Sequence, residues 1–154
     1  MDVPKPTADH ARLEKLAGVW RGTETMHPSD WDPQGGQAEG VTRARVALGG
    51  FPVIVDYEQI RGGERTFEGH GVFTWDPQAR EVILHWFDSI GQGREEFRGG
   101  WTGDVLAVTS KNQMGFARLT YDRSTPGTLL SGMEMSRDGK NWSSLFDGQY
   151  TEES

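Results

Sequence analysis

The chain contains no cysteine among its 154 residues, which excludes a disulfide framework, a thiolate nucleophile and a cysteine-ligated metal. It also has no apolar run of the length that spans a membrane. The opening stretch, MDVPKPTADHARLEKLAG, holds no apolar segment of the kind found in secretion signals. Together these absences predict a cytoplasmic protein with no membrane partner.

Basic residues are in the minority, with 16 Lys and Arg against 23 Asp and Glu and a formal net charge of −7. Nucleic acids and anionic membranes are bound by basic surfaces, so we expect neither as a partner. Glycine is abundant instead, with 21 residues, where average usage is roughly 7%. Because the glycines are scattered among aromatic and β-branched residues, they predict the tight turns and strand bends of an all-β fold.

Helical patterning is confined to residues 8–16, where Thr7 is a suitable N-cap, Leu13 and Leu16 form an apolar pair, and Gly18 follows as a stop. The rest of the chain consists of short β-prone runs separated by turn signals. These runs predict ten strands, at roughly 19–27, 38–48, 51–61, 64–75, 81–88, 94–101, 104–111, 114–122, 128–137 and 140–150.

The connections between these strands are short, with hairpin or turn signals at 61–64, 76–77, 102–104 and 137–140. Connections this short join antiparallel neighbours. A long meander of strands normally closes on itself, which removes exposed edges. We therefore predict one domain over residues 1–154, an all-β, single antiparallel up-and-down β-barrel of about ten strands. A short N-terminal helix would cap one end, with residues 1–6 flexible, and a two-sheet sandwich is the alternative.

The stretch LAGVWRGTE (16–24) holds Gly18-x-Trp20 after a short helix and resembles the G-x-W opening of lipocalin and calycin barrels. That resemblance implies that Gly18 and Trp20 form a structural plug at the closed end. Residues 12–150 as a whole are similar to an uncharacterised bacterial domain-of-unknown-function family with a calycin-like β-barrel, of the lipocalin and fatty-acid-binding-protein type. The similarity is carried by HPSDWDPQGGQAEG (27–40), LGGFPVIVDYEQIRGG (48–63), FEGHGVFTWDPQ (67–78) and LHWFDSIG (84–91).

The chain departs from better-known barrels at three points. Lipocalins place an arginine of the last strand on the G-x-W tryptophan, whereas 140–150 has none and only Arg137 comes near. Fatty-acid-binding proteins have a two-helix lid where this chain has the short loop PSDWDPQGG. Nitrobindin-type haem barrels open with G-x-W-x-G-x-G and use a late histidine, but here Glu24 replaces the last glycine and no histidine follows His85. We therefore predict no cofactor. Haem binding is the least favoured function, after ligand binding and an enzymatic role.

His70 and His85 fall in the middle of two strands that form a hairpin. Pairing Trp75 with Glu81 would separate the two histidines, and a shift of one residue would bring them face to face. Even a facing pair lacks a clear third ligand, so we predict no metal site.

Asp56 and Glu58 share one face of a strand, and Tyr57 points to the other face. The favoured interpretation is that the two carboxylates face outward and pair with Arg43 or Arg45 on the neighbouring strand. The same interpretation applies to Arg118 with Glu134, although an inward face remains open for both groups.

Aromatic and methionine side chains along the strands are candidates to line a pocket for a ligand. The candidate ligand-binding residues are Phe73, Trp86, Phe97, Phe116, Arg118, Met133 and Met135. Trp31, an aromatic residue in a polar loop, is a candidate lid over the barrel mouth.

These features favour a protein that binds a small, mainly apolar ligand with a polar end in the barrel interior. Its partner would be a small hydrophobic or amphipathic molecule. A cyclase, isomerase or lyase is the alternative, with His70, His85, Tyr57 and Asp88 as candidate catalytic residues. A homodimer is a further option, through exposed aromatics such as Trp101 or Trp142.

Overall fold

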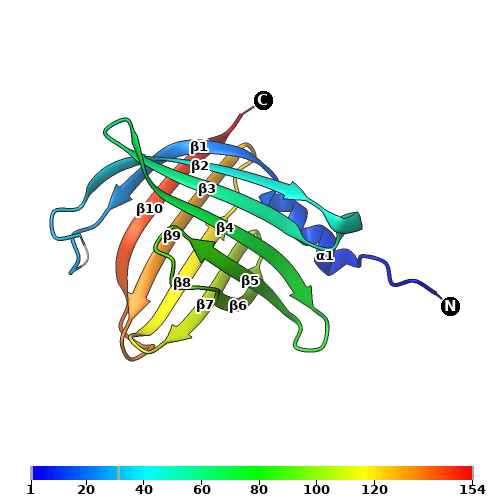
Figure 1. Cartoon of the computed structure of the whole chain (residues 1–154). Helices are drawn as coiled ribbons and strands as arrows, with labels where there is room; N and C mark the ends of the chain where they lie inside the picture. The colour runs from blue at the N-terminus through cyan, green and yellow to red at the C-terminus, as the bar shows by residue number, and fades with distance from the viewer. Residues whose placement is uncertain (1, 31, 154) are drawn as a thin grey trace.

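The computed structural model describes residues 2–30 and 32–153, and in this part of the chain ten antiparallel strands close into one barrel (Figure 1). Each strand pairs with its neighbours in chain order, and the first strand pairs with the last. The sandwich alternative is therefore wrong, because no sheet edge is left open. The strands are β1 (Gly18–Met26), β2 (Gly36–Val46), β3 (Val53–Arg61), β4 (Glu64–Asp76), β5 (Glu81–Asp88), β6 (Glu95–Thr102), β7 (Val105–Asn112), β8 (Gly115–Asp122), β9 (Thr128–Ser136) and β10 (Ser143–Glu152).

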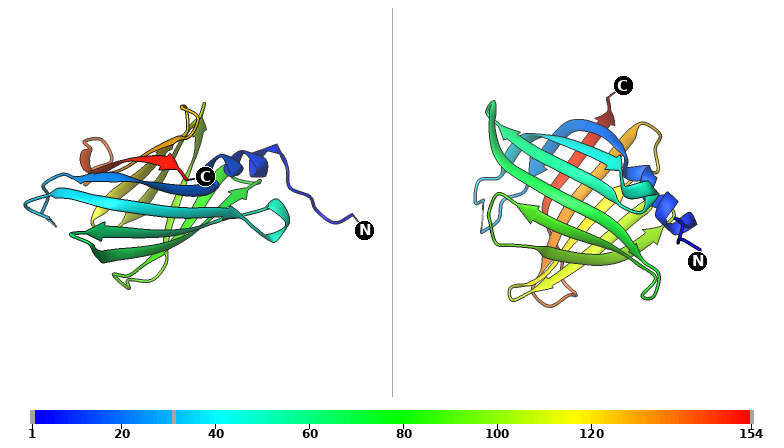
Figure 2. Two further views of the ribbon diagram at one scale, coloured as in Figure 1. Left: turned by 90° about the horizontal axis from the view of Figure 1, so that it is seen from above. Right: turned by 45° about the vertical axis from the view of Figure 1, so that its right-hand side comes forward.

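The predicted N-terminal helix is confirmed as a short α-helix, α1 (Ala8–Arg12), that continues into a 3₁₀ turn, η1 (Leu13–Leu16). Thr7 is the N-cap, and its backbone N–H donates to His10 Nδ1 over 2.9 Å. A second 3₁₀ turn, η2 (Leu48–Gly50), joins β2 to β3. The helix lies at one end of the barrel, close to where the chain leaves β10 (Figure 2). None of the helices in the described residues is both long and apolar enough to cross a membrane.

Side chains alternate between the inside and the outside of the barrel along the strands, except at irregularities between Gln59 and Ile60 and between Ser144 and Phe146. In β1 the inward residues are Trp20, Gly22, Glu24 and Met26, which follows from their pairing with inward residues of β2 and β10. In β4 and β5 the pairing of Asp76 with Glu81 fixes which residues face inward.

A packed core fills the interior beneath the helix. Its members are almost completely buried: Leu13, Leu16, Val53, Phe73, Val82, Leu84, Phe97, Leu106 and Val108. They come from the helix and from β3 to β7, so the helix seals this end by contributing its own two leucines. Burial of a side chain of this size stabilises the fold by about 1.5–3 kcal/mol, so this core is the main source of stability.

Trp20 closes the helix end, and an arginine covers it. The indole Nε1 donates to the Leu16 carbonyl over 3.0 Å, and the ring is 0% exposed. The guanidinium of Arg123 lies 4.5 Å from the ring centroid, and its nitrogens donate to the carbonyls of Lys15 (2.8 Å) and Thr128 (2.7 Å). In lipocalins the arginine that covers this tryptophan comes from the last strand, whereas here Arg123 directly follows β8.

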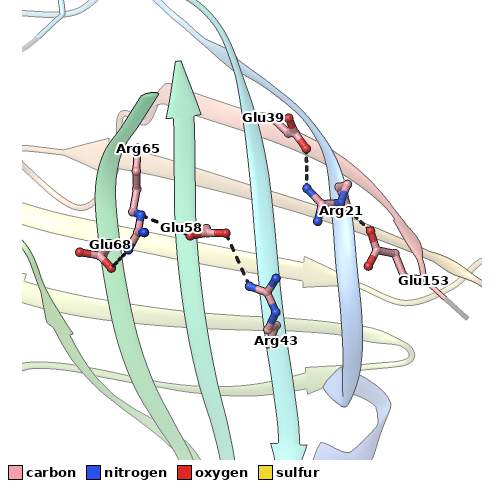
Figure 3. A network of polar contacts seen from close by, with 7 residues as sticks. All are labelled: Arg21, Glu39, Arg43, Glu58, Arg65, Glu68 and Glu153. Atoms are coloured by element: carbon pink, nitrogen blue, oxygen red, sulfur yellow. Dashed lines mark hydrogen bonds and ion pairs between the residues drawn. The ribbon is translucent and has the colours of Figure 1, made fainter. Parts of the chain in front are cut away.

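The outer wall over β1 to β4 carries a network of ion pairs (Figure 3). The Glu58 carboxylate lies 3.6 Å from Arg43 and 3.5 Å from Arg65, so the favoured outward interpretation of Glu58 is confirmed. Arg21 pairs with Glu39 over 2.7 Å in the same network. Val41 stands between Arg21 and Glu58 in the strand pairing and is 0% exposed, because long charged side chains cover it.

Candidate functional site

A fully buried carboxylate is the central feature of the barrel interior. Glu24 is 0% exposed and points inward from β1. The Tyr57 hydroxyl donates to it over 2.6 Å, Gln59 Nε2 donates over 3.0 Å, and the Tyr150 hydroxyl donates to its other oxygen. We call these four residues the Glu24 cluster. All of the partners are donors, which is the arrangement that satisfies an ionised carboxylate.

Two glycines create the space for this cluster. Gly40 lies on β2 beside Glu24, and Gly148 lies directly opposite Glu24 on β10. A Cβ atom at Gly40 would collide with the Glu24 carboxylate, and one at Gly148 would collide with the Tyr150 hydroxyl. The barrel wall is therefore thinned by glycine at the two places where the buried polar groups meet it.

The three tyrosines of the chain all lie in this interior. Burial, and then the nearby Glu24 carboxylate, raises the pKa values of Tyr57 and Tyr150 far above their usual range. Burial alone raises the pKa of Tyr121. All three phenols therefore stay protonated at neutral pH, and two of them hold their protons toward Glu24.

The interior next to the packed core is not completely filled. Besides Trp75 and Trp101, four inward side chains pack against that core and yet are only half-buried: Trp86, Leu119, Tyr121 and Met133. We call them the boundary residues. Leu119 and Met133 lie in the middle of their strands, far from either rim. An inward side chain at that depth keeps accessible surface where open space lies inside the barrel, so the half-buried Leu119 indicates such a space. Met133 also lines a hollow of about 460 Å³ over β8 to β10.

Tyr121 connects the two regions of the interior. Its ring packs edge-on against Phe73 of the packed core, with ring centroids 5.5 Å apart, and it also contacts the group formed by Trp20, Leu129 and Tyr150. Among the described residues its hydroxyl has no hydrogen-bond partner within the protein. A free hydroxyl therefore stands near the Glu24 cluster.

Trp86 leads from this space toward the open end. Its ring lies against Gly69 and Gly71 of β4, where a Cβ at either position would press on it, which explains the glycines on both sides of His70. Its Nε1 donates to Asp88 Oδ2 over 3.0 Å, and its ring centroid is 6.4 Å from that of Tyr57. Two of the candidate catalytic residues, Tyr57 and Asp88, thus lie inside the barrel on either side of one tryptophan.

Five of the seven candidate ligand-binding residues point inward: Phe73, Trp86, Phe97, Met133 and Met135. Phe73 and Phe97 belong to the packed core, where each is 2% exposed, so they do not border open space. Trp86, Met133 and Met135 are half-buried and border the interior.

The prediction that Phe116 and Arg118 line the pocket is wrong, because both lie on the outer wall. In β8 the inward positions are Ala117, Leu119 and Tyr121, so the even-numbered residues Phe116 and Arg118 face out. The Arg118 guanidinium pairs with Glu134 over 3.0 Å and lies 4.0 Å from the ring centroid of Trp142. Neither residue can line an interior pocket.

The candidate catalytic residues His70 and His85 also lie on the outer wall. His70 pairs with Phe87 and His85 with Val72, so both histidines share the outer face without facing each other. His70 Nδ1 lies 2.7 Å from Asp56, and Arg94 lies 3.2 Å from His85 Nδ1. They cannot act as acid or base on a molecule inside the barrel. In the described part of the chain, no group of three or more His, Asp or Glu side chains is arranged to hold a metal ion.

Two proposed dimer aromatics are also less exposed than expected. Trp101 is half-buried, with Arg12 and Lys15 each 5.5 Å from its ring centroid, and Trp142 is half-buried beneath Arg118. Their faces are taken by cations of the same chain. The lid candidate Trp31 lies outside the described residues, although Asp32 beside it pairs with Arg61 over 2.8 Å.

The sequence interpretation missed Glu24, Gln59, Tyr121 and Tyr150 as site residues. Glu24 was noted only as a departure from a haem-barrel motif. Its position on the same face of β1 as Trp20, four residues on, was the signal that could have placed it inside. Gln59 likewise shares a face with Tyr57.

The outer wall formed by the described residues includes hollows at two places. The larger, of about 460 Å³, lies over β8, β9 and β10 around Gly132 and is rimmed by Asp122, Glu134 and Asp147. These carboxylates already have partners in Ser124, Arg118 and His27. The smaller, of about 110 Å³, lies over β2 to β4 beside Glu58. Among the described residues, the buried side-chain atom without a hydrogen-bond partner is Trp101 Nε1, which lines neither hollow.

The fold and the site together define a closed ten-stranded antiparallel barrel, sealed at one end by a helix and a tryptophan and polar in part of its interior. The chain belongs to the family described as "Protein of unknown function (DUF1579)", whose model matches residues 5–151. The expected membership in such a barrel family is confirmed. A search of curated proteins finds no match.

Two solved structures share the fold. Rv2717c from M. tuberculosis is 14% identical with a TM-score of 0.70, and the alignment covers 98% of this chain and 100% of that one. The S-type phycobiliprotein lyase CPES from Guillardia theta is 10% identical with a TM-score of 0.61, and covers 97% and 99%. At these identities the likeness extends to the barrel architecture alone.

Proposed function

We propose that the protein binds a small, mainly apolar molecule with a polar end inside the barrel, between the Glu24 cluster and the boundary residues. The observation that carries this proposal is a 0% exposed carboxylate in an interior that also holds half-buried inward side chains. Burying a carboxylate costs free energy that an apolar residue in its place would not. Local choices that work against stability are typical of functional sites.

The two sides of the space suit an amphipathic ligand. Leu119 and Met133 offer apolar surface, whereas Tyr57 and Tyr150 offer hydroxyl oxygens on the Glu24 side. Ligand pockets are commonly of this kind, mostly apolar with a few polar groups that fix the orientation.

The proposal is tested with Nile red, a neutral dye whose fluorescence rises in apolar surroundings, together with native mass spectrometry of freshly purified protein. We expect the wild-type chain to bind the dye, and Leu119→Trp, which fills the interior, to bind it at least about tenfold more weakly. The matched control is Leu130→Trp on the outer face of β9, where Leu130 is 42% exposed and lines the larger outer hollow. Binding lost in Leu130→Trp and kept in Leu119→Trp would overturn the interior site in favour of the outer hollow.

A second candidate is a lyase or isomerase that uses the same interior. It is favoured by the 2.6 Å contact of Tyr57 with Glu24, a phenol and carboxylate pair within proton-transfer reach. The barrel of a phycobiliprotein lyase has the same architecture, which makes the fold compatible with such activity in another protein. If the protein is an enzyme, we expect the Glu24→Gln variant to co-purify with a molecule that the wild-type protein converts and releases. Identical bound masses in both proteins would argue for binding alone.

A further inference from the structure

The hydrogen-bonding groups of the interior limit which polar end a ligand can have. Tyr57 and Tyr150 direct their hydroxyl protons to Glu24, and Gln59 Nε2 donates to the same carboxylate and lies 3.4 Å from the Tyr57 oxygen. Because Gln59 Nε2 donates to the Tyr57 oxygen, that oxygen keeps one lone pair, whereas the lone pairs of the Tyr150 oxygen remain available. This side of the interior therefore accepts hydrogen bonds and has few protons left to donate.

Cations are missing from this side as well. Among the described strand residues, arginines at mid-strand point outward, as Arg43, Arg98 and Arg118 do. Arg61, at the open end of β3 beyond an irregularity between Gln59 and Ile60, is paired with Asp32 of the loop after β1.

Carboxylates, in contrast, occur along the route from the open end to the cluster. Asp88 and Glu95 point inward near the open end and are half-buried, and Glu24 lies deeper. Opposite charges attract strongly where little water separates them, and like charges repel for the same reason. Among the described residues, an anionic group entering this interior would meet three carboxylates and no unpaired arginine or lysine.

A second observation points to a ligand rather than to a closed polar core. The Tyr121 hydroxyl has no partner among the described residues, and Tyr121 borders the open space together with Leu119 and Met133. Because Tyr121 is only half-buried, its hydroxyl is accessible to a molecule in that space. This group can accept a bond from a ligand that also reaches Tyr150, because Tyr121 packs against the group that contains Tyr150.

We infer that the polar end of the ligand is a hydrogen-bond donor, an organic amine or ammonium group in the first place, and not a carboxylate or other anion. The inference rests on the proposed interior site and specifies its ligand class. The donor binds among the oxygens of Tyr57, Tyr150 and Tyr121, with the Glu24 charge behind them. The apolar body lies along Leu119 and Met133.

The test uses three ligands with one ten-carbon tail: decylamine, decanol and decanoate. Each displaces Nile red from the full chain at neutral pH, below its micelle concentration. We expect affinity to fall in the order amine, alcohol, carboxylate, with the carboxylate about 10- to 100-fold weaker than the amine, as for hydrogen bonds to charged groups. Decanoate binding as tightly as decylamine would overturn the inference. This comparison uses the wild-type chain, so it does not depend on a variant that folds.

Variants then locate the preference. In Glu24→Gln the ratio of amine to carboxylate affinity should fall at least tenfold, whereas the matched outer-wall variant Glu39→Gln (Figure 3) should leave it unchanged. Because the chain is acidic, surface attraction of the amine is tested with added salt, which screens exposed charges far more than buried ones. A preference that disappears in salt, or persists in Leu119→Trp, would overturn the inference. If Nile red binding itself is unaffected by Leu119→Trp, the interior site fails, which is a separate result.

Discussion

The packed core and the Glu24 cluster lie in one barrel but are built on opposite principles. The core is apolar and closely filled, with Phe73 and Phe97 each 2% exposed. The cluster holds a charged group, two phenols and an amide, and it faces side chains that are only half-buried. The core accounts for stability, while the cluster costs stability and offers chemical selectivity. One barrel can do both because its interior is wide enough for two regions.

The largest expected difference between the regions is in the free energy of unfolding. Trp20→Ala removes the completely buried plug and its hydrogen bond to Leu16, and should lower that free energy by about 3–5 kcal/mol. Trp86→Ala removes a half-buried ring and should cost clearly less, while it weakens Nile red binding more. Urea unfolding of both variants measures the difference. An equal or larger cost for Trp86→Ala would show that the interior near Glu24 is packed like the core.

A smaller effect is expected from a single methyl group beside Glu24. Gly40→Ala places a Cβ against the carboxylate and should destabilise the fold by about 1–3 kcal/mol. Gly100→Ala on β6 is the matched control, because a Cβ there meets nothing within 4 Å, and it should stay within about 0.5 kcal/mol of the wild type. Thermal unfolding compares the two. A neutral Gly40→Ala would mean that the cluster can move aside.

Alkaline titration tests the cluster in the unmodified chain. The pKa values of all three tyrosines are raised by burial, so phenolate absorbance should not develop near the ordinary pKa of about 10 while the protein is folded. The folded state holds these protons more tightly than the unfolded state does. Their contribution to stability is therefore complete below about pH 10 and is lost as the pH rises above it. In guanidinium the same tyrosines should titrate normally, and a tyrosine that titrates near pH 10 in the folded chain would contradict this account.

The smallest effect is expected on the outer wall. Glu58→Gln removes the carboxylate between Arg43 and Arg65 and should change the unfolding free energy little, because exposed ion pairs contribute little. Added salt should reduce even that change. Urea unfolding at low and high salt checks it. A loss as large as that of Gly40→Ala would mean that the ion pairs covering Val41 matter as much as the interior.

The sequence predicted the barrel well because its local signals agree. Turn glycines such as Gly62 and Gly103, which adopt positive φ, mark the strand ends, and strict alternation in β4 marks the faces. It failed where faces depend on the pairing between strands. A change of one residue in the register moves each side chain of a strand to the other face of the barrel wall. For this reason Phe116 and Arg118 were placed on the wrong face, and the faces of His70 and His85 could not be decided.

The Glu24 cluster could not be assembled from the sequence for a different reason. Glu24 and Tyr150 are brought together by the pairing of β1 with β10, two segments more than a hundred positions apart. Gln59 and Tyr57 join from β3 across the interior. Alternation gives the face of each residue, but only barrel closure brings residues of distant strands to the same height.

That closing pair of strands also determines the order of events during synthesis. β1 is translated before β10, residues 143–152, and one of its edges has no partner until β10 has been made. Trp20 cannot be covered by Arg123 before β8 is complete. Contacts so distant in sequence form slowly, and an early strand with an unpaired edge is prone to aggregate. We therefore expect the nascent chain to fold cooperatively and late, with truncated chains lacking β10 bound by chaperones.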